Sequence, residues 1–349
     1  MKLSEKAVRK LFLISIVSVL FLPGCRDEVE ISGYFSFSDF ETRKVCLDDI
    51  EYSPAMLDTW SSSLQLSGNS VFILSPRSAD KLVTRFDFET GDKQMLVPRG
   101  RGPGELLGIR GIFVMDETLF VIDNNERKII SYVCSPSDSL VYDSSLSLDT
   151  YYHRVVPIPG GGYLGSPMTD GRFCLISPEG KSGEPFGSFM PVKGPREAVN
   201  SMALQTLVAF SPDGSHMCSA YQDADCIEFY DRDLNLTRRL IGPERRIPEV
   251  KKWEGNEGYG YTTTPMYKEY MGICGNEDGV YVGYVGYERK KGDPDRGLNS
   301  ILFFDWEGNC KIRYLLPFEL DAFDIDANNR LVGVVDDEEH PQLVRFPLP

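Results

Sequence analysis

Hydrophobic and polar residues alternate along much of the chain with the two-residue period of β-strands. Within residues 96–132, a Gly- and Arg-rich segment leads into a strand containing Ile112 and Val114. A tight turn at Asp116-Glu117 leads to a second strand, and a polar loop leads to a third. No window keeps a helical period for longer than about three turns. The pattern therefore predicts an all-β fold built from antiparallel meanders.

The same unit recurs six times, as the positions of its first tight turn show. These turns begin at Gly68, Asp116, Gly160, Asp213, Asp278 and Asn328. Apolar pairs precede five of the turns, whereas the fifth turn keeps only Ile273. A third strand follows in each unit and a fourth in most. Four-stranded units at this period are typical of propeller blades, so we expect a six-bladed β-propeller with four-stranded antiparallel blades.

The sixth unit ends at Pro349, directly after its third strand. A three-stranded blade would expose a row of unpaired backbone groups at its edge. Near the N-terminus, Arg43–Leu47 is a strand-like run that belongs to no unit. We therefore expect this N-terminal strand to become the outer strand of the last blade and to close a propeller that spans residues 42–349.

The N-terminus has the pattern of an export signal. Four basic residues precede the apolar segment 11–22, which is too short to span a bilayer by itself. The segment ends in Leu22-Pro23-Gly24-Cys25, which resembles a bacterial lipoprotein box. This resemblance implies cleavage before Cys25 and diacylation of its sulfur. The alternative is a fortuitous cysteine after an ordinary signal peptide.

Directly after Cys25, the run Arg26-Asp-Glu-Val-Glu30 resembles the surface-export signal of Bacteroidetes lipoproteins. We expect residues 1–24 to be a signal peptide and residues 25–41 a lipidated tether. The chain would then be an outer-membrane lipoprotein, held to the membrane by its N-terminal lipid, on the periplasmic or the cell-surface side.

Three internal motifs carry a family resemblance. The run Gly100-Arg-Gly-Pro-Gly-Glu105 precedes an inner strand, Leu119-Phe-Val-Ile-Asp123 follows it, and Phe210-Ser-Pro-Asp-Gly214 forms a turn. Together they resemble the six-bladed, TolB-like propeller lipoproteins of Bacteroidetes. The resemblance implies the fold and lipid anchoring. It implies no activity, because a fold does not determine a function.

Charge and cysteine content exclude several classes of function. The formal net charge of −15 opposes binding to nucleic acid, whose phosphates would be repelled. Beyond Cys25, seven of the eight cysteines are left, and they lie at irregular spacings without a CxxC motif. We therefore expect neither a disulfide framework nor a zinc site, and we expect most of these thiols to pack in strands.

The long insertions fall at one face of the predicted disc. They are the blade-to-blade crossovers 97–111, 185–206 and 242–271, and the loop 286–300 within the fifth unit. The turns expected at the opposite face are uniformly short. Long loops without their own strand pairing are often functional, so we expect the binding surface at the crossover face.

The first crossover offers Arg99, Arg101, Glu105 and Arg110 among glycines, and Arg127 follows in the polar loop of the second unit. Arginine forks suit carboxylate or phosphate groups, and we assign Arg99, Arg101, Glu105 and Arg127 as candidate ligand contacts. The alternative is that Glu105 and an arginine tie the crossover to the next blade. The run is not a nucleotide loop, because it lacks the Gly-Lys-Ser/Thr signature and precedes a strand.

The third crossover contains Trp253, Tyr259, Tyr261 and Tyr267 among glycines. Rigid aromatic side chains on a surface loop are typical of sugar or peptide binding, so these residues complete the candidate ligand-binding set. The alternative is that they fold back and fill the central channel.

Catalytic motifs are absent from the sequence. It holds three histidines and neither a GxSxG nor an HExxH motif. An acidic loop at 336–340, together with Asp123, Asn124, Asp223 and Asp225, offers oxygen atoms that could hold calcium, as in some lactonase-like propellers, although no calcium-loop motif is present. We assign no catalytic or metal-binding residue and expect no cofactor.

The function we expect is that of a lipid-anchored, non-catalytic binding or scaffold module for a glycan, peptide or protein. One alternative is a six-bladed lactonase-like or other hydrolase with an acidic or calcium site in the central channel. Another is a purely structural partner within an outer-membrane complex.

Overall fold

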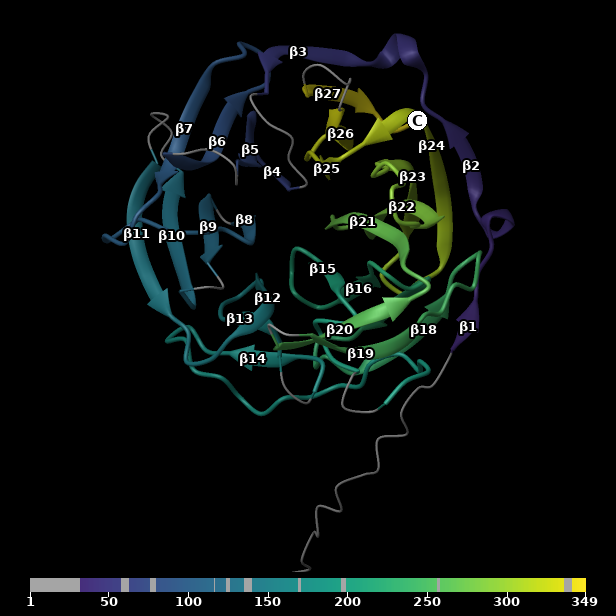
Figure 1. Cartoon of the computed structure of the whole chain (residues 1–349). Helices are drawn as coiled ribbons and strands as arrows, with labels where there is room; N and C mark the ends of the chain where they lie inside the picture. The colour runs from purple at the N-terminus through teal and green to yellow at the C-terminus, as the bar shows by residue number, and fades with distance from the viewer. Residues whose placement is uncertain are drawn as a thin grey trace, which may run out of the picture.

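Six sheets of mainly antiparallel strands stand around a central axis and form a six-bladed β-propeller, which confirms the predicted fold (Figure 1). The computed structural model describes residues 32–57, 63–75, 80–115, 117–123, 126–134, 140–168, 171–195, 199–255, 258–335 and 341–349. The predicted signal segment and Cys25 lie outside these ranges. Within them, no helix is long and apolar enough to cross a bilayer.

Blades one, two, four and five carry four strands in sequence order from the axis outwards. Blade one consists of β4 (Leu64–Ser67), β5 (Ser70–Leu74), β6 (Lys81–Asp87) and β7 (Lys93–Pro98). Blade two consists of β8 (Gly111–Met115), β9 (Thr118–Asp123), β10 (Lys128–Cys134) and β11 (Leu140–Ser147). Blades four and five consist of β15 (Thr206–Phe210), β16 (Met217–Tyr221), β17 (Cys226–Tyr230) and β18 (Leu236–Ile241), then β21 (Tyr267–Gly275), β22 (Val280–Glu288), β23 (Leu298–Phe304) and β24 (Cys310–Leu320).

Blade three is shorter than predicted. It contains β12 (Tyr152–Pro157), β13 (Tyr163–Pro167) and β14 (Cys174–Ile176). Where a fourth strand would lie, the chain makes only two isolated bridges, Ile176 to Ser182 and Phe173 to Phe186. Gly183, Pro185 and Gly187 interrupt this segment, and glycine and proline disfavour a continuous strand.

The middle strands of the blades are deeply buried. Every residue of β5, β16 and β17 is buried, because both faces of a blade pack against neighbouring blades. The apolar clusters accordingly join side chains of adjacent sheets, as Ala209 of β15, Val282 of β22 and Phe304 of β23 do. Because both faces are buried, these strands are nearly continuous apolar runs. A sheet with one solvent-exposed face would instead show alternating apolar and polar residues. The seven cysteines in the described residues are free, and Cys174, Cys218 and Cys226 are buried.

An N-terminal strand closes the ring, as predicted, but it is not Arg43–Leu47. Blade six consists of β25 (Ala322–Ile325), β26 (Arg330–Val335), β27 (Gln342–Pro347) and the closing strand β3 (Glu51–Met56). β3 pairs antiparallel with β27, with Tyr52 opposite Val344. The predicted residues fall instead in and after β2 (Glu41–Lys44), which pairs parallel with β24 of blade five.

The reason for this difference is the path of the N-terminal segment along the outer rim (Figure 1). β1 (Gly33–Tyr34) pairs parallel with β18 of blade four, β2 then lies on blade five, and β3 reaches blade six last. Two short 3-10 turns, Phe37–Asp39 and Leu47–Asp49, separate these strands. The apolar pattern at 43–47 reflects burial of Val45 in the core of blade five.

Residues 33–41, which the sequence places in the tether, thus pack on the rim of blades four and five. Phe35 and Phe40 are buried there, and their rings meet the ring of Phe304 edge to face at centroid distances of 5.4 and 5.2 Å. Such aromatic pairs add to the free energy gained by burial alone. The rim segment is therefore an integral part of the propeller.

Arg345 joins the closing strand to both the last and the first blade. From β27, its Nε and Nη2 atoms donate to the Glu51 carboxylate of β3 at 2.9 and 2.5 Å. Its Nη1 atom donates to Glu89 of blade one at 2.7 Å, and the guanidinium lies 4.3 Å from the ring centroid of Phe88. The Ser53 hydroxyl of β3 also donates to the Phe88 carbonyl at 3.1 Å.

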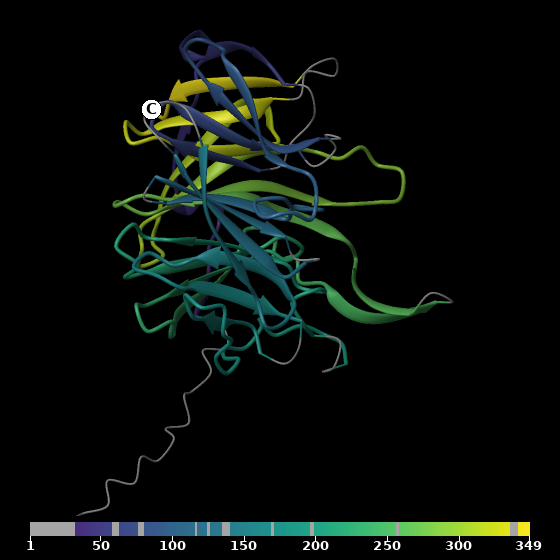
Figure 2. The same cartoon turned by 90° about the vertical axis from the view of Figure 1, so that its left-hand side faces the viewer.

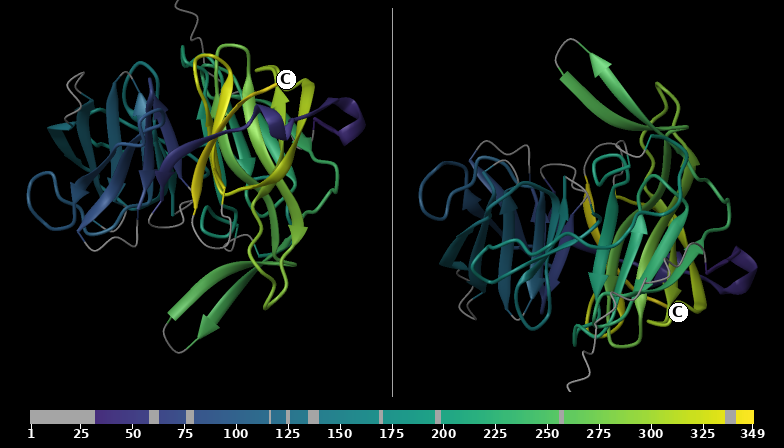
Figure 3. Two further views of the ribbon diagram at one scale, coloured as in Figure 1. Left: turned by 90° about the horizontal axis from the view of Figure 1, so that it is seen from above. Right: turned by 90° about the horizontal axis from the view of Figure 1, so that it is seen from below.

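The two faces of the disc differ in the way the insertions predict (Figures 2 and 3). The hairpin of β19 (Glu249–Gly255) and β20 (Gly258–Thr264) projects from one face. The loop between β22 and β23 projects from the same face, which is turned towards the viewer in Figure 1. We call this side the crossover face.

Replacing Arg345 by alanine is expected to destabilise the ring. The change leaves Glu51 and Glu89 without their shared cation, and we expect the free energy of unfolding to fall by about 1–3 kcal/mol. Denaturant unfolding of the purified protein measures it. The matched control is Arg330→Ala, because Arg330 pairs with Asp326 at 2.8 Å within one turn of blade six and is more exposed. A control change as large as that of Arg345→Ala would contradict the closing role of Arg345.

Candidate ligand-binding site

The inner strands of the six blades surround a channel along the axis, and this channel opens into a cavity of about 550 Å³. Residues of all six inner strands line it, including Gln65 of β4, Ile112 of β8 and Arg154 of β12. Parts of two crossovers, 202–205 and 261–263, complete the wall. The cavity therefore lies at the mouth of the channel on the crossover face, where the insertions gather.

Polar and apolar side chains share the cavity wall. The polar, uncharged ones bear amides or hydroxyls and are Ser63, Gln65, Gln205, Gln222, Thr262 and Thr263. The apolar ones include Met202, Met266, Met271 and Phe323. Amide and hydroxyl groups donate and accept hydrogen bonds, which suits a ligand with several hydroxyl groups.

Four cationic and two acidic side chains line the cavity. The cations are Arg110, Arg154, Lys268 and Arg289, and the acids are Asp223 and Asp295. Lys268 donates to Asp295 at 3.0 Å, and the charge of Arg289 acts on Asp223. Each acid is thus matched to one cation. Among the residues that the structure describes, no carboxylate pairs with Arg110 or Arg154.

Arg154 is the most unusual of these cations. Its Nε atom is buried and has no hydrogen-bond acceptor among the described residues. Burial lowers the pKa of this guanidinium to about 10, so the group still carries its charge at neutral pH. A buried donor without an acceptor costs free energy, and a ligand can supply the missing acceptor.

A side pocket of about 90 Å³ adjoins the main cavity between blades two and three. Arg110, Arg154 and Gln205 line both spaces, and His153 lines the side pocket. Burial lowers the pKa of His153 to about 4, and the charges of Arg154 and Arg110 add to this effect. The imidazole is therefore neutral at neutral pH, and the pocket carries the positive charge of its two arginines.

Of the three acidic residues proposed for calcium that the structure describes, Asp223 lines the cavity, and Asp123 and Asp225 do not. Asp225 accepts hydrogen bonds from the Tyr270 hydroxyl at 2.6 Å and from two crossover amides at 2.8 Å. Asp123 is buried and accepts a hydrogen bond from the Gly108 amide at 3.0 Å. Both carboxylates hold crossovers in place. Asn124 and the loop 336–340 lie outside the described residues, and within those residues no group of three or more His, Cys, Asp or Glu side chains is placed to hold a metal ion.

The structure brings two of the predicted aromatic residues to the site. Tyr261, at the base of the hairpin, and Tyr267, at the start of β21, both line the cavity. Trp253 is 57% exposed on β19, opposite Gly260, and does not line it. Tyr259 lies in β20, and its side chain is outside what the structure describes.

Arg99 and Glu105 lie away from the cavity and hold the first crossover together. Arg99 Nη1 donates to the Leu107 carbonyl at 2.7 Å, and Glu105 accepts a hydrogen bond from the Gly102 amide at 2.8 Å. A Cβ atom at Gly100 would lie 2.0 Å from a Glu105 carboxylate oxygen, which explains the glycine there. Both contacts lie within the crossover, whereas the structural alternative expected Glu105 and an arginine to tie it to the next blade. Side chains of blade two make that connection: Lys128 Nζ donates to the Glu105 carbonyl at 3.2 Å, and the Tyr132 hydroxyl donates to the Gly104 carbonyl at 2.7 Å.

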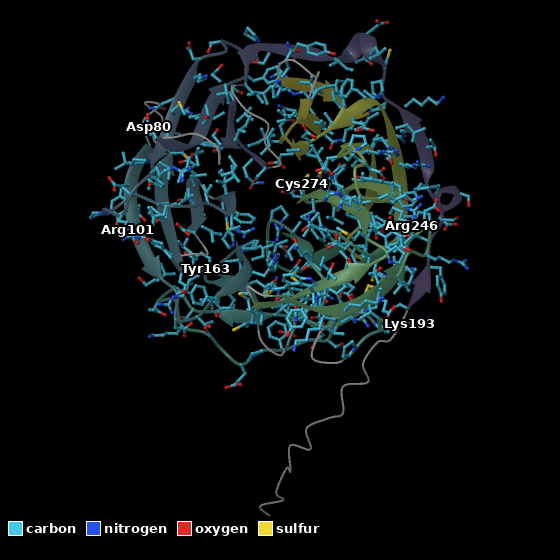
Figure 4. The ribbon with its side chains drawn as sticks, viewed as in Figure 1. Asp80, Arg101, Tyr163, Lys193, Arg246 and Cys274 are labelled. Atoms are coloured by element: carbon cyan, nitrogen blue, oxygen red, sulfur yellow. The ribbon has the colours of Figure 1, made fainter. Side chains whose placement is uncertain are left out.

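Arg101 and Arg127 also do not line the cavity. Figure 4 shows Arg101 at the outer rim of the ring, where it is largely exposed and 3.8 Å from Glu126. Arg127 Nη1 donates to the Asp149 carbonyl at 3.3 Å, and its guanidinium lies 5.0 Å from the ring centroid of Tyr151. The arginines assigned from the first crossover and the aromatics assigned from the third therefore do not form one site.

Of the channel-lining residues, Arg110 belongs to the first-crossover arginines and Asp223 to the acidic set considered for calcium, whereas Arg154 and His153 were not proposed from the sequence. One signal was available. Arg154 stands in an inner strand beside Val155 and Val156, where a charged side chain faces either a neighbouring blade or the channel. Their convergence could not be predicted, since Arg110 and Asp223 come from different blades.

Replacing Asp223 by asparagine is expected to stabilise the protein above pH 6. Burial raises the pKa of Asp223 from 3.8 to about 6, against the attraction of Arg289. Between these values the folded protein keeps a proton that the unfolded chain releases, so the free energy of unfolding falls as the pH rises. Asp223→Asn removes this loss and should gain about 1–3 kcal/mol at pH 7 and little near pH 3.5. Thermal unfolding at pH 7 and at pH 3.5 measures this gain in stability, and the exposed Asp233→Asn serves as the control. An equal gain for Asp223→Asn at the two pH values would contradict the prediction.

Comparisons with known proteins agree with this architecture. A family model described as TolB-like 6-blade propeller-like matches residues 67–328. No curated protein sequence matches the chain. A solved member of the DUF4221 family from Bacteroides vulgatus has a TM-score of 0.54 and 13% identity, over 86% of this chain and 98% of that one. An exported protein of Bacteroides fragilis has a TM-score of 0.52 and 13% identity, over 91% and 99%.

A calcium-binding regucalcin from Agrobacterium tumefaciens has a TM-score of 0.50 and 10% identity, over 88% of this chain and 95% of its own. At such identities the likeness extends to the fold alone. The family model, in contrast, covers well over half of the chain. The chain therefore belongs to the TolB-like six-bladed propeller family.

Proposed function

We propose that this protein is an exported, lipid-anchored propeller that binds a glycan, without chemical turnover, at the channel mouth on its crossover face. The observation that carries this proposal is the cavity of about 550 Å³, which Tyr261 and Tyr267 line together with amide and hydroxyl side chains. Concave sites that combine aromatic rings with convergent polar groups are typical of small-ligand binding.

A glycan suits this wall better than a protein surface or an apolar peptide does. The rings of Tyr261 and Tyr267 can pack on the apolar face of a sugar ring, and their hydroxyls can bond to its polar edge. Gln65, Gln205 and Gln222 offer donors and acceptors at several points around the same space. A folded protein partner would need a broad, exposed contact area rather than a concave channel mouth.

The anchoring part of the proposal depends on the N-terminal segment. The lipoprotein box at Cys25 supports attachment to the outer membrane, and the name of the Bacteroides fragilis neighbour supports export. From Ser32 onwards the chain runs along the rim of blade four, where the Ser32 amide donates to the Arg239 carbonyl. Attachment at the rim keeps the channel mouth accessible to a ligand.

The hydrolase alternative gains no support from the acids that line the cavity in the described part of the chain. Asp295 accepts a hydrogen bond from Lys268, and Asp223 faces Arg289 without a second carboxylate at the cavity wall beside it. A calcium site needs several oxygen ligands on one ion. We therefore keep the binding function as the proposal.

Substituting both cavity tyrosines is expected to abolish glycan binding. The purified protein should bind members of a glycan array, and Tyr261→Ala with Tyr267→Ala should weaken the affinity by about tenfold or more, because each lost stacking contact contributes about 1 kcal/mol. Isothermal titration with the best array ligand measures the change. The matched control is Tyr151→Ala, since Tyr151 is 51% exposed and does not line the cavity. An array without any bound glycan, or an equal loss in the control, would contradict the proposal.

A further inference from the structure

Two cations at the cavity are placed without anionic partners. Arg110 stands at the end of the first crossover, directly before β8, and Arg154 stands in β12 of the next blade. Both line the main cavity and the side pocket. No hydrogen bond or ion pair joins either guanidinium to a described residue, and the Nε atom of Arg154 is buried as well.

This arrangement runs against the overall composition of the chain. With a formal net charge of −15, the protein has many carboxylates, and several arginines elsewhere in the fold are paired with them. Arg172 and Arg239, for example, share the buried carboxylate of Glu228. Arg154 is half-buried, and its buried Nε atom lacks an acceptor, which costs free energy. Arg110 is exposed to solvent at the cavity and offers a second guanidinium. The pair therefore marks a place where an acceptor can arrive from outside.

The side pocket limits what this acceptor can be. At about 90 Å³ it is much smaller than the adjoining main cavity of about 550 Å³. A carboxylate or sulfate group suits the smaller space, and the sugar ring that carries it suits the larger one. Guanidinium groups bind such oxyanions through charge-assisted, paired hydrogen bonds.

We propose that Arg110 and Arg154 form an oxyanion subsite that recognises an acidic substituent of the bound ligand. This inference rests on the proposed function: if the ligand is a glycan, the subsite selects an acidic saccharide. Its carboxylate or sulfate would lie in the side pocket, and its rings would lie against Tyr261 and Tyr267. Gln205, which lines both spaces, can bond to the same substituent or to the neighbouring hydroxyl.

Calorimetric titration of the purified protein tests the subsite with defined probes. The probes are trigalacturonate, galactotriose, galactose 6-sulfate and inorganic sulfate. We expect trigalacturonate or galactose 6-sulfate to bind about tenfold or more tightly than galactotriose does. The preferred probe distinguishes a carboxylate from a sulfate ester. Arg110→Gln and Arg154→Gln should each weaken the affinity for the acidic probe about tenfold. The affinity of each variant for galactotriose should change by less than about twofold.

The matched control is Arg232→Gln, which removes the same charge from an exposed position far from the cavity wall. A second variant, Arg154→Met, tests whether the residue merely supports the fold. We expect its melting temperature to equal or exceed that of the wild type, because a buried charge without an acceptor is removed, while binding of the acidic probe is lost. A lower melting temperature with unchanged binding would overturn the proposal.

The remaining outcomes separate this inference from the proposed function. Equal affinities for acidic and neutral saccharides, unchanged in the arginine variants, would overturn the oxyanion subsite and keep the glycan-binding function. Binding of inorganic sulfate that disappears in Arg110→Gln and Arg154→Gln, without binding of any saccharide, would keep the subsite and overturn the glycan-binding function.

Discussion

The pairing of β3 with β27 is the constraint on which the rest of the molecule depends. Without β3, blade six would end in an exposed three-stranded edge, and the first and last blades would meet without a shared strand. Arg345 connects this pair to Glu89 of blade one, and Asp324 of blade six accepts a hydrogen bond from the Leu66 amide of blade one at 3.0 Å. Closure sets the six inner strands around one axis, and it thereby creates the channel and brings Arg110, Arg154 and Asp223 to its mouth.

Buried arginines have two different roles in this ring. Arg172 donates to the Glu228 carboxylate, to the Tyr221 hydroxyl and, at 2.9 Å, to the Ser219 hydroxyl, while Arg239 donates to Glu228 at 2.6 Å. This network is enclosed between blades three and four and helps to fix how the two blades pack. The Nε atoms of Arg172 and Arg154 both lack an acceptor among the described residues, so the two arginines differ in their remaining contacts and in their place. Arg172 donates to three side chains within the core, whereas Arg154 lines the channel cavity and makes no hydrogen bond to a described residue. Our proposal therefore assigns a ligand to the arginine that lines the cavity.

Much of the fold could be predicted because local patterns determine it. Turn residues such as Gly68 and Asp213, followed three residues later by an apolar strand, fix each hairpin, and six hairpins fix the number of blades. The poor fifth copy has a local cause: Gly275 stands where the second apolar residue of the pair would be, and a Cβ atom there would lie 2.8 Å from the Trp306 ring and 2.9 Å from the Phe210 carbonyl oxygen. The local sequence pattern could not identify the closing strand. Residues 43–47 and 51–56 are both strand-like, and only the path along the rim decides which one reaches β27.

The face that carries the candidate site could be predicted from the sequence, whereas most of the residues that line it could not. Loop lengths located the crossover face, and Tyr261 and Tyr267 do line the cavity. The glycine-rich sequence around Arg99 and Arg101 suggested that they contact a ligand. In the fold, Arg99 donates to a carbonyl of its own crossover, and Arg101 is exposed at the rim. Whether an arginine has a carboxylate partner depends on residues that are distant in sequence and meet only in the fold. The sequence alone therefore could not distinguish Arg154 from the paired arginines.

We propose that ring closure holds Arg110 and Arg154 unpaired at the channel mouth for an external oxyanion. A crystal structure of the protein grown with bromide, located by its anomalous scattering, tests this most directly. We expect a bromide ion within hydrogen-bond reach of both guanidinium groups in the side pocket. Bromide bound only at exposed basic residues, with the two guanidinium groups paired to carboxylates of the protein itself, would contradict it.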